Sequence, residues 1–568
     1  MERKVLIGNP VSAGIAMAEA YLYEPLVITV EEGYFEAGKE TEYINAFHDA
    51  LFRTKSELQQ LFEKLALEDV EKAKIFAAHS ELLEDEEILD EIQMAIEDDC
   101  MYPDAAIEKV FTEFASILAG VADPLIAGRA ADLIDVKGRL LRVYQGKEEK
   151  NLSCLNKDVI VIAHDLLPSD TATLDRAHVK GIITEIGGSN SHSAILARSY
   201  QIPAILGVGN VMKEIPDGVM LVMDALTGEL ILAPTAEELA VAERKQDAFL
   251  QKRKEEETYL DRPCMMADGT EIQIGINVGS TDFDVTKSSF DFVGLFRTEF
   301  LYMENTALPG EEEQFEAYKK VLENAKGNPV TLRTLDIGGD KTLPYMELPK
   351  EDNPFLGKRA LRLCLSEPDI FLTQLRAALR ASAFGPLQIM FPMVGSMEDI
   401  HHAKGYVRQA MEELDAAGIA YDKNIKIGIM IEIPSIGLIA DMAAEEVDFA
   451  SIGSNDLTQY LSATDRMNPD TTSYYQNYSP AMVRFLGNIF SAFDVAGKPI
   501  SVCGEMAGNP SAAVLLAGLG AKKLSMSAAN IAGVKAALSR VTLDEAKELA
   551  ERCKCVRTEE DVRKLMDI

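Results

Sequence analysis

Two patterns of hydrophobic and polar positions alternate along the chain. From about residue 38 to residue 145, apolar side chains recur every three or four residues between charges, as at Leu51 and Leu58, with few breakers. This period predicts long amphipathic helices. On either side the apolar residues form short runs, as at residues 4–7 and 159–163, which are typical of buried strands. The helical segment is therefore predicted to be inserted into an α/β domain that begins near the N-terminus.

Beyond residue 262, short apolar runs alternate with helical stretches to the end of the chain. Eight candidate strands over about 300 residues, separated mostly by helices, predict a (β/α)8 barrel of the TIM type. An open doubly wound sheet is the alternative, but no Gly-x-Gly-x-x-Gly sequence follows the first run. The predicted domains of this α/β multidomain protein are an α/β domain of residues 1–23 and 146–236, an inserted helical subdomain of residues 24–145, a linker helix of residues 237–261 and a barrel of residues 262–568.

The charge balance excludes some classes of partner. The 568 residues include 56 lysines and arginines against 92 aspartates and glutamates, a net charge of −36 at pH 7. This excess argues against binding to nucleic acid and to anionic membranes, and it suits docking to a basic patch on a protein partner. No apolar run is long enough to span a bilayer, and the N-terminus lacks the apolar core of a signal peptide. Because the seven cysteines are scattered, a reducing cytoplasm is the predicted compartment.

One segment delivers a histidine to the start of a predicted helix. The glycines Gly187 and Gly188 follow a strand-like run, and His192 stands between the hydroxyls of Ser191 and Ser193. Backbone N–H groups at a helix N-terminus favour anions, so a histidine there can accept a phosphoryl group whose charge is partly balanced. Taken alone, the segment is more commonly a serine-capped helix with a surface histidine.

A barrel places its chemistry on the loops that follow its strands. Charged side chains gather at these points of the predicted barrel, namely Arg297, Glu299, Arg333, Asp336, Arg359, Glu432, Asp456, Arg466 and Glu505. Arginines clamp phosphate and carboxylate oxygens, so the set predicts a site for a compact, multiply charged anion, although any one arginine alone is more often a surface ion pair. Glu432 and Asp456 offer two oxygen ligands for a hard divalent cation, and Mg²⁺, which keeps waters and shares substrate oxygens, is the predicted one. Cys503, at another strand end, is a candidate for proton transfer.

These motifs together resemble enzyme I of the bacterial sugar phosphotransferase system, the phosphoenolpyruvate–protein phosphotransferase family, over nearly the whole chain. The stretches that carry the resemblance are Gly187-Gly188-x-x-Ser191-His192, Phe296-Arg297-Thr298-Glu299-Phe300-Leu301, Arg333-Thr334-Leu335-Asp336-Ile337-Gly338-Gly339-Asp340-Lys341, Asn353-Pro354-Phe355-Leu356-Gly357, Ser451-Ile452-Gly453-Ser454-Asn455-Asp456-Leu457-Thr458-Gln459-Tyr460 and Val502-Cys503-Gly504-Glu505. The resemblance implies that His192 takes the phosphoryl group of phosphoenolpyruvate, releasing pyruvate, and passes it to a histidine of the carrier protein HPr, the first step of sugar uptake.

The resemblance also implies a role for each matching residue. The residues expected to bind phosphoenolpyruvate are Arg297, Arg333, Arg359, Arg466, Asn455 and Asp456. Glu432 and Asp456 are expected to hold Mg²⁺, Cys503 to protonate the methylene carbon of enolpyruvate, and the Thr171 hydroxyl to steady His192. The family implies a homodimer through the barrel and a swing of the N-terminal part on residues 237–257. The inserted helices correspond to the HPr-binding subdomain, with Glu68, Glu71, Phe76, Leu82, Leu83, Glu84 and Asp85 as candidate contacts, although several of these residues could belong to the helix core.

Two departures from the family pattern and two alternatives stay open. Asn190 stands where the family commonly has threonine, and Asn477-Tyr478 stands where it has proline and another residue. A relative of pyruvate phosphate dikinase or phosphoenolpyruvate synthase would need a nucleotide-binding domain, for which there is no room before His192. A non-catalytic sensor of phosphoenolpyruvate would be marked by loss of a catalytic residue, yet His192, Glu432, Asp456 and Cys503 are all present.

Overall fold

The computed structural model describes residues 3–24, 29–31, 33–66, 76, 79–80, 82–119, 124–147, 152, 155–166, 174–188, 191–281, 283, 289–303, 305, 307–338, 343, 345–346, 351–466 and 468–567. The chain folds as two compact units, Met1–Glu243 and Arg244–Ile568. The division falls inside helix α9 (Ala236–Glu257), which belongs to the stretch predicted as a linker. The finer domain boundaries drawn from the sequence stay predictions.

The N-terminal unit contains an eight-stranded sheet whose strands follow the order β1-β8-β7-β3-β4-β5-β6-β2. The strands are β1 (Lys4–Ile7), β2 (Asn9–Ser12), β3 (Ile15–Tyr23), β4 (Val159–Ala163), β5 (Val179–Thr184), β6 (Ala204–Leu206), β7 (Met220–Asp224) and β8 (Glu229–Leu232). The neighbours β3, β4, β5 and β6 are parallel, so their carboxyl ends share one edge. All five residues of β4 are buried, because α7 (His192–Tyr200) and α8 (Val211–Glu214) contribute to the apolar packing of the sheet.

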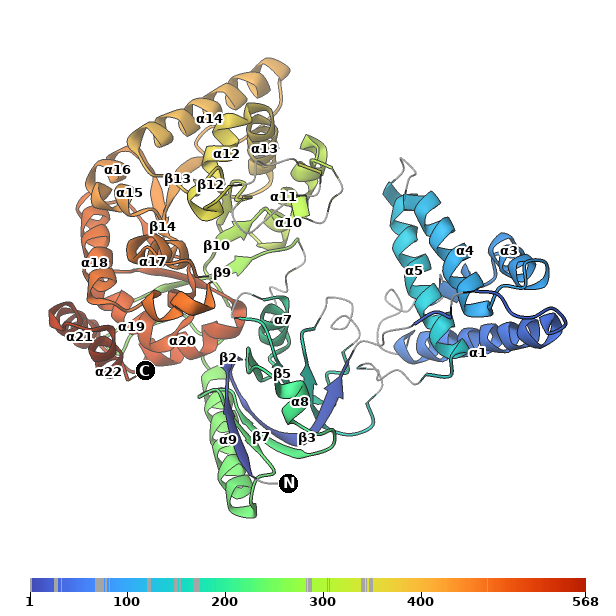
Figure 1. Cartoon of the computed structure of the whole chain (residues 1–568). Helices are drawn as coiled ribbons and strands as arrows, with labels where there is room; N and C mark the ends of the chain where they lie inside the picture. The colour runs from blue at the N-terminus through green and yellow to red at the C-terminus, as the bar shows by residue number, and fades with distance from the viewer. Residues whose placement is uncertain are drawn as a thin grey trace. The chain divides into compact units, whose positions relative to one another are not determined.

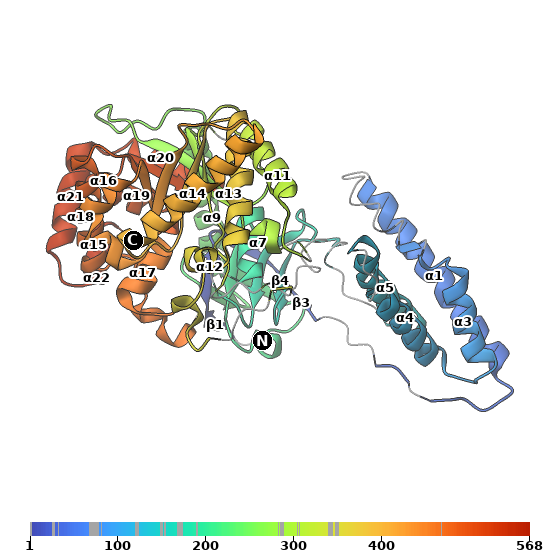
Figure 2. The same ribbon diagram turned by 90° about the horizontal axis from the view of Figure 1, so that it is seen from above.

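Between β3 and β4 the chain forms a helical subdomain with its own core. Its helices are α1 (Glu40–Ala66), α3 (Glu86–Glu97), α4 (Pro103–Ala119) and α5 (Pro124–Tyr144), of which α4 and α5 run side by side (Figure 1 and Figure 2). The predicted candidate Leu83 lies fully inside this core and Phe76 is 9% exposed, so neither can serve as a broad partner contact. Glu84 and Asp85 are exposed, whereas Glu68 and Glu71 lie outside the described residues.

The C-terminal unit is a closed barrel of parallel strands in the order β10-β11-β12-β13-β14-β15-β16-β9, surrounded by helices (Figure 1). The strands are β9 (Gln273–Val278), β10 (Phe292–Arg297), β11 (Val330–Arg333), β12 (Leu387–Phe391), β13 (Lys426–Ile431), β14 (Phe449–Ile452), β15 (Ile500–Val502) and β16 (Lys523–Met526). The helices are α10 (Phe300–Met303), α11 (Glu311–Asn324), α12 (Leu361–Ser366), α13 (Pro368–Ala381), α14 (Met397–Ala417), α15 (Pro434–Leu438), α16 (Ala440–Glu446), α17 (Ser454–Ser462), α18 (Pro480–Val495), α19 (Pro510–Leu519), α20 (Ile531–Leu538), α21 (Leu543–Cys555) and α22 (Glu559–Leu565). The predicted fold class, with an eight-stranded barrel as its C-terminal part, is confirmed.

In the part of the chain that the structure describes, no helix is long and apolar enough to cross a membrane.

Candidate active site

The ends of the barrel strands bring the predicted anion-binding and cation-binding residues to one mouth. Arg297 and Arg333 are the last residues of β10 and β11, Glu432 follows β13, and Cys503 follows β15. Asn455 and Asp456 lie in the first turn of α17, directly after β14. Since all eight strands are parallel, these loops open on the same face. The predicted residues therefore do come together in the barrel, apart from His192 and Thr171, which belong to the N-terminal unit.

Two buried carboxylates hold the buried arginines. Glu299 accepts from Arg333 at 2.7 Å, and Asp336 lies 2.9 Å from Arg333 Nη1 and 2.8 Å from Arg359 Nη2. Arg359 Nη2 lies 3.7 Å from Asp456 Oδ2 as well. Although burial opposes it, the neighbouring carboxylates raise the pKa of both guanidiniums above the usual arginine range. Both cations are thus fixed in orientation before any ligand arrives, which is the condition for efficient electrostatic stabilisation.

Arg297 differs from the other arginines of the mouth. Its side chain is reached by solvent, and no ion pair joins it to a carboxylate among the described residues. Desolvation by surrounding protein atoms, followed by the neighbouring charge of Arg333, lowers its pKa from the ordinary value. A cation that is crowded by another cation and lacks a partner gains most from an incoming anion. Arg297 is therefore the guanidinium that a bound phosphate or carboxylate would neutralise first.

Arg466 and Arg359 flank an aromatic ring on the loop after β11. Their guanidinium carbons lie 5.9 Å and 5.8 Å from the centroid of the Phe355 ring. The hydroxyl of Tyr460 donates to the backbone carbonyl of Phe355 at 2.5 Å, and Arg466 Nη1 lies 3.4 Å from Asp456 Oδ1. This arrangement joins the Phe355 loop to α17, so that the two arginines line one wall of the mouth.

Glu432 and Asp456 have the properties of ligands for a hard divalent cation. Glu432 is 1% exposed, and burial, with the nearby charges of Asp456 and Asp336, raises its pKa to about 8. Its Oε1 accepts from the Met393 N–H at 2.6 Å, while among the described residues the buried Oδ1 of Asp456 has the 3.4 Å ion-pair contact with Arg466 but no hydrogen bond. Desolvated carboxylate oxygens with unused lone pairs fit a cation such as Mg²⁺, which accepts its remaining oxygens from substrate and water. The described residues contain no cluster of three or more metal-ligating side chains, so substrate and water oxygens would have to complete the shell.

Two backbone features position Glu432. Met393 adopts φ of 54°, in the left-handed region, and it aims its N–H at the carboxylate. A Cβ atom on Gly453 would lie 2.8 Å from Glu432 Oε2, so the glycine lets the carboxylate approach the backbone at the start of α17. Neither contact is visible in the spacing of the sequence.

Cys503 is a buried thiol at the floor of the mouth. It packs in a cluster with Leu295, Met390, Met430 and Phe449, and its Sγ lies 3.6 Å from the carbonyl oxygen of Ile452. Burial raises the pKa of this thiol above its ordinary value, against the opposing effects of a Ser451 hydrogen bond and the Arg333 charge. The group is therefore protonated at neutral pH, which a proton donor requires.

Sequence reasoning missed the side chain that fastens the arginine loops to the barrel wall. Gln374 of α13 is 1% exposed, and its amide group donates to Thr298 Oγ1 at 3.1 Å and accepts from the Leu335 N–H at 2.8 Å. It also donates to the Tyr318 hydroxyl at 3.1 Å. Gln374 thus holds both the turn after β10 and the turn after β11. The only sign of this role in the sequence was that Gln374 is a polar residue on an otherwise apolar face of α13.

The N-terminal unit places His192 as the first residue of α7. Ser191 is the N-cap, and its side chain accepts from the Ala194 N–H at 3.3 Å. The Ser193 hydroxyl donates to Asp165 Oδ1 at 3.0 Å, which ties the start of the helix to the loop after β4. The side chain of His192 lies outside the described residues, as do Thr171 and Asn190 entirely, so their predicted roles stay predictions.

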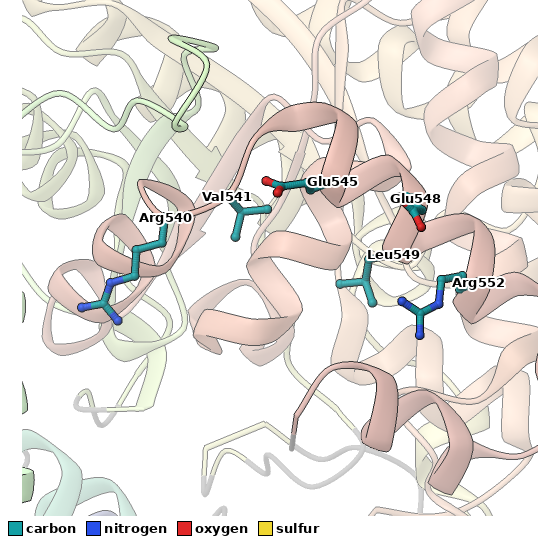
Figure 3. Close-up of a pocket in the computed structure, with 6 residues that line it drawn as sticks. All are labelled: Arg540, Val541, Glu545, Glu548, Leu549 and Arg552. Atoms are coloured by element: carbon teal, nitrogen blue, oxygen red, sulfur yellow. The ribbon is translucent and has the colours of Figure 1, made fainter.

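A pocket of about 340 Å³ lies elsewhere in the C-terminal unit, on α21 and the turn before it (Figure 3). It is lined by Arg540, Val541, Glu545, Glu548, Leu549 and Arg552. Glu545 serves the capping box of α21. The pocket contains none of the predicted site residues, and we assign it no part in the chemistry.

Comparison with known proteins finds relatives that align with nearly the whole chain. Three family models match the chain: the N-terminal domain of PEP-utilising enzymes over residues 7–129, their mobile domain over 155–228 and their PEP-binding domain over 253–543. The chain is 43% identical to the phosphoenolpyruvate-protein phosphotransferase of Bacillus subtilis, an alignment that covers 98% of each chain. It is 42% identical to the protein of the same name from Geobacillus stearothermophilus, over 99% of this chain and 97% of that one. For the protein of that name from Staphylococcus epidermidis the identity is 40%, over 99% of each.

Proposed function

Because the chain belongs to the phosphoenolpyruvate–protein phosphotransferase family, enzyme I, we propose that its reaction proceeds through the residues described above. The observation that supports this most strongly is the barrel mouth, where Arg297, without an ion pair among the described residues, and the carboxylate-held Arg333 and Arg359 surround a pair of buried acids. Such a mouth suits phosphoenolpyruvate, a small molecule that carries a phosphate and a carboxylate. The alternatives of a dikinase relative and of a sensor find no support in the names of the matched proteins.

The proposed chemistry divides between the two units. A ring nitrogen of His192 attacks the phosphorus of phosphoenolpyruvate in line, and the bond from phosphorus to the enol oxygen breaks. The arginines, with Asn455 and the start of α17, stabilise the charge on the transferring group and on the departing enolate. The thiol of Cys503 donates its proton to the methylene carbon, which gives pyruvate, and the thiolate recovers a proton from water. Thr171 orients the imidazole of His192.

The phosphoryl group then passes from His192 to a histidine of the partner protein, HPr. When bound by Glu432 and Asp456, Mg²⁺ would supply positive charge beside the substrate oxygens. We further propose that the barrel forms a homodimer, that α9 is the hinge on which the N-terminal unit moves, and that the protein acts in the cytoplasm. The hinge proposal is supported by α9 itself, in which Ala242 is the one buried residue and within which the two units divide. The net charge of −36 supports a basic docking face on the partner.

Phosphoryl transfer from labelled phosphoenolpyruvate tests the proposal. We expect acid-labile, base-stable label on the wild-type protein in the presence of Mg²⁺, with an equal amount of pyruvate, and no label on His192→Ala. Cys503→Ala should bind phosphoenolpyruvate but form pyruvate far more slowly, since general acid catalysis contributes roughly 10²–10⁴-fold. Equal labelling of wild type and His192→Ala would place the acceptor on another residue and refute the assignment.

A further inference from the structure

A second histidine, His164, lies at the sheet edge from which α7 begins. It directly follows β4, and its ring forms a 2.7 Å contact with Glu185, which directly follows β5. We propose that the protonated ring of His164 is a further catalytic group, whose Nε2–H donates to the phosphoryl group carried by His192. This inference rests on the proposed phosphorylation of His192 and goes beyond it, because it assigns a stabilising cation to the N-terminal unit.

The register of the sheet places His164 beside the turn that leads to His192. Strands β4 and β5 are parallel with Ala163 opposite Thr184, so His164 and Glu185 leave the sheet at the same edge. The His164 carbonyl accepts from the Ile186 N–H at 3.2 Å, just before the glycine turn.

The loop after β4 also holds the residue that follows His192. The Ser193 hydroxyl donates to Asp165 Oδ1 at 3.0 Å and to the Leu166 carbonyl oxygen at 3.2 Å. Ser193 is fully buried, so this contact fixes the first turn of α7 against the loop. The loop that carries His164 is therefore bonded to the chain on both sides of the proposed phosphoryl acceptor.

The hydrogen bonds of Glu185 determine which ring nitrogen of His164 is available. Glu185 accepts from His164 Nδ1 through Oε2 and from the Met212 N–H, at 3.0 Å, through Oε1. Although burial opposes it, these hydrogen bonds lower the pKa of Glu185, so the carboxylate is ionised and can only accept. Nδ1 must then carry the hydrogen, which leaves Nε2 as the nitrogen not engaged by Glu185, on a side chain that is 65% exposed.

Protonation of Nε2 changes what His164 can do. The neutral ring presents a lone pair, which repels phosphoryl oxygens, whereas the imidazolium presents a donor and a positive charge. The charged group in contact with the ring is Glu185, on which Lys213 of α8 acts; Asp165 is adjacent in sequence and Glu24 occupies the matching position after β3. Because only the protonated ring can donate from Nε2, the contribution of His164 is expected at low pH and absent at high pH.

Nuclear magnetic resonance titration of the full-length protein tests this directly. The imidazole midpoints of His164 and His178 would be measured before and after phosphorylation with phosphoenolpyruvate and Mg²⁺. His178 is a matched control, because its Nδ1 lies 3.1 Å from Asp175, but it precedes β5 and so lies at the opposite edge of the sheet. We expect the His164 midpoint to rise by about one pH unit, as for a phosphoryl group a few ångströms away, while the His178 midpoint stays unchanged.

Rates of phosphoryl transfer to His192 give the second readout. His164→Gln should be about tenfold slower than wild type at pH 6 and equal to it at pH 8.5, and His178→Gln should match wild type at both. Glu185→Gln keeps a hydrogen-bond acceptor for the His164 ring but removes the negative charge beside it. The pH at which the rate of phosphoryl transfer falls should therefore be lower in this variant than in wild type. Phosphorylation without a shift at His164, or a slowing of His164→Gln that is the same at both pH values, would overturn this inference alone. Absence of phosphorylation would overturn the proposed function as well.

Discussion

Asp336 should contribute more to the barrel mouth than any other single carboxylate, because two buried arginines share it. In Asp336→Asn the amide oxygen can accept from one guanidinium, but the amide N–H₂ then faces the other as a donor. Arg359 would be left with Asp456 at 3.7 Å, whereas Arg333 would keep Glu299 at 2.7 Å. Breaking a buried ion pair from one side costs roughly 3–5 kcal/mol, since the remaining charge stays desolvated.

We therefore expect Asp336→Asn to lower the free energy of unfolding by about 4 kcal/mol. The matched variant Glu299→Gln should lose about half as much, because it frees only Arg333, which keeps Asp336 at 2.9 Å. The KM for phosphoenolpyruvate should rise about tenfold in Asp336→Asn, which corresponds to about 1.4 kcal/mol of lost anion binding.

Urea denaturation followed by far-ultraviolet circular dichroism measures the stability, since the chain has no tryptophan to report by fluorescence. Pyruvate formation at varied phosphoenolpyruvate gives KM. Equal losses for Asp336→Asn and Glu299→Gln, or a loss below about 1 kcal/mol for Asp336→Asn, would refute the reasoning that sharing makes Asp336 dominant.

Three further outcomes follow from the barrel. The pKa of Glu432 is raised to about 8, so the metal-free folded state keeps a proton that the unfolded chain releases near pH 4.5. The free energy of unfolding should therefore fall by up to about 4 kcal/mol as the pH rises from 4.5 to 8. Urea denaturation midpoints across this range should show the decrease, and Glu432→Gln should abolish it. Cys503→Ser should retain binding of phosphoenolpyruvate, measured by calorimetry, while pyruvate formation slows by roughly 10²-fold or more, and an unchanged rate would exclude the thiol as the donor. Gln374→Leu should raise the KM for phosphoenolpyruvate and lower the stability of the fold. Tyr318→Phe should lower stability only, because the hydrogen bonds of Gln374 to Thr298 and Leu335 survive. Equal changes of KM in the two variants would mean that Gln374 has only a structural role.

The sequence was sufficient to predict the barrel and most of its mouth. Parallel strands end on one face, so residues such as Arg297 and Glu432 could be brought together from their positions after apolar runs alone. The arginine and acid side chains are also chemically distinctive, and their number at strand ends made a shared site the simplest interpretation.

Partners that come from distant elements could not be predicted in this way. Gln374 reaches Thr298 across 76 residues and Leu335 across 39, and nothing in the local pattern of α13 indicates which loops its amide meets. The contact of His164 with Glu185 depends on the register of β4 against β5. The prediction of Leu83 as a partner contact was wrong, because its side chain lies in the subdomain core. A helical period identifies an apolar face, but it does not tell whether that face packs inside the subdomain or meets a partner.

The nearly balanced charges of the barrel mouth have a consequence for the order in which its ligands bind. The four arginines Arg297, Arg333, Arg359 and Arg466 face the five carboxylates Glu299, Asp336, Glu432, Asp456 and Glu505, so the mouth carries a net charge of only −1 when every acid is ionised. A trianionic substrate entering alone would leave an uncompensated negative charge in a desolvated place, and a divalent cation entering alone would leave a positive one. Each ligand should therefore tighten the binding of the other by the same factor, as thermodynamic reciprocity requires. Substrate and divalent cation should then bind to the mouth with positive cooperativity, so that the states with one ligand alone are sparsely populated.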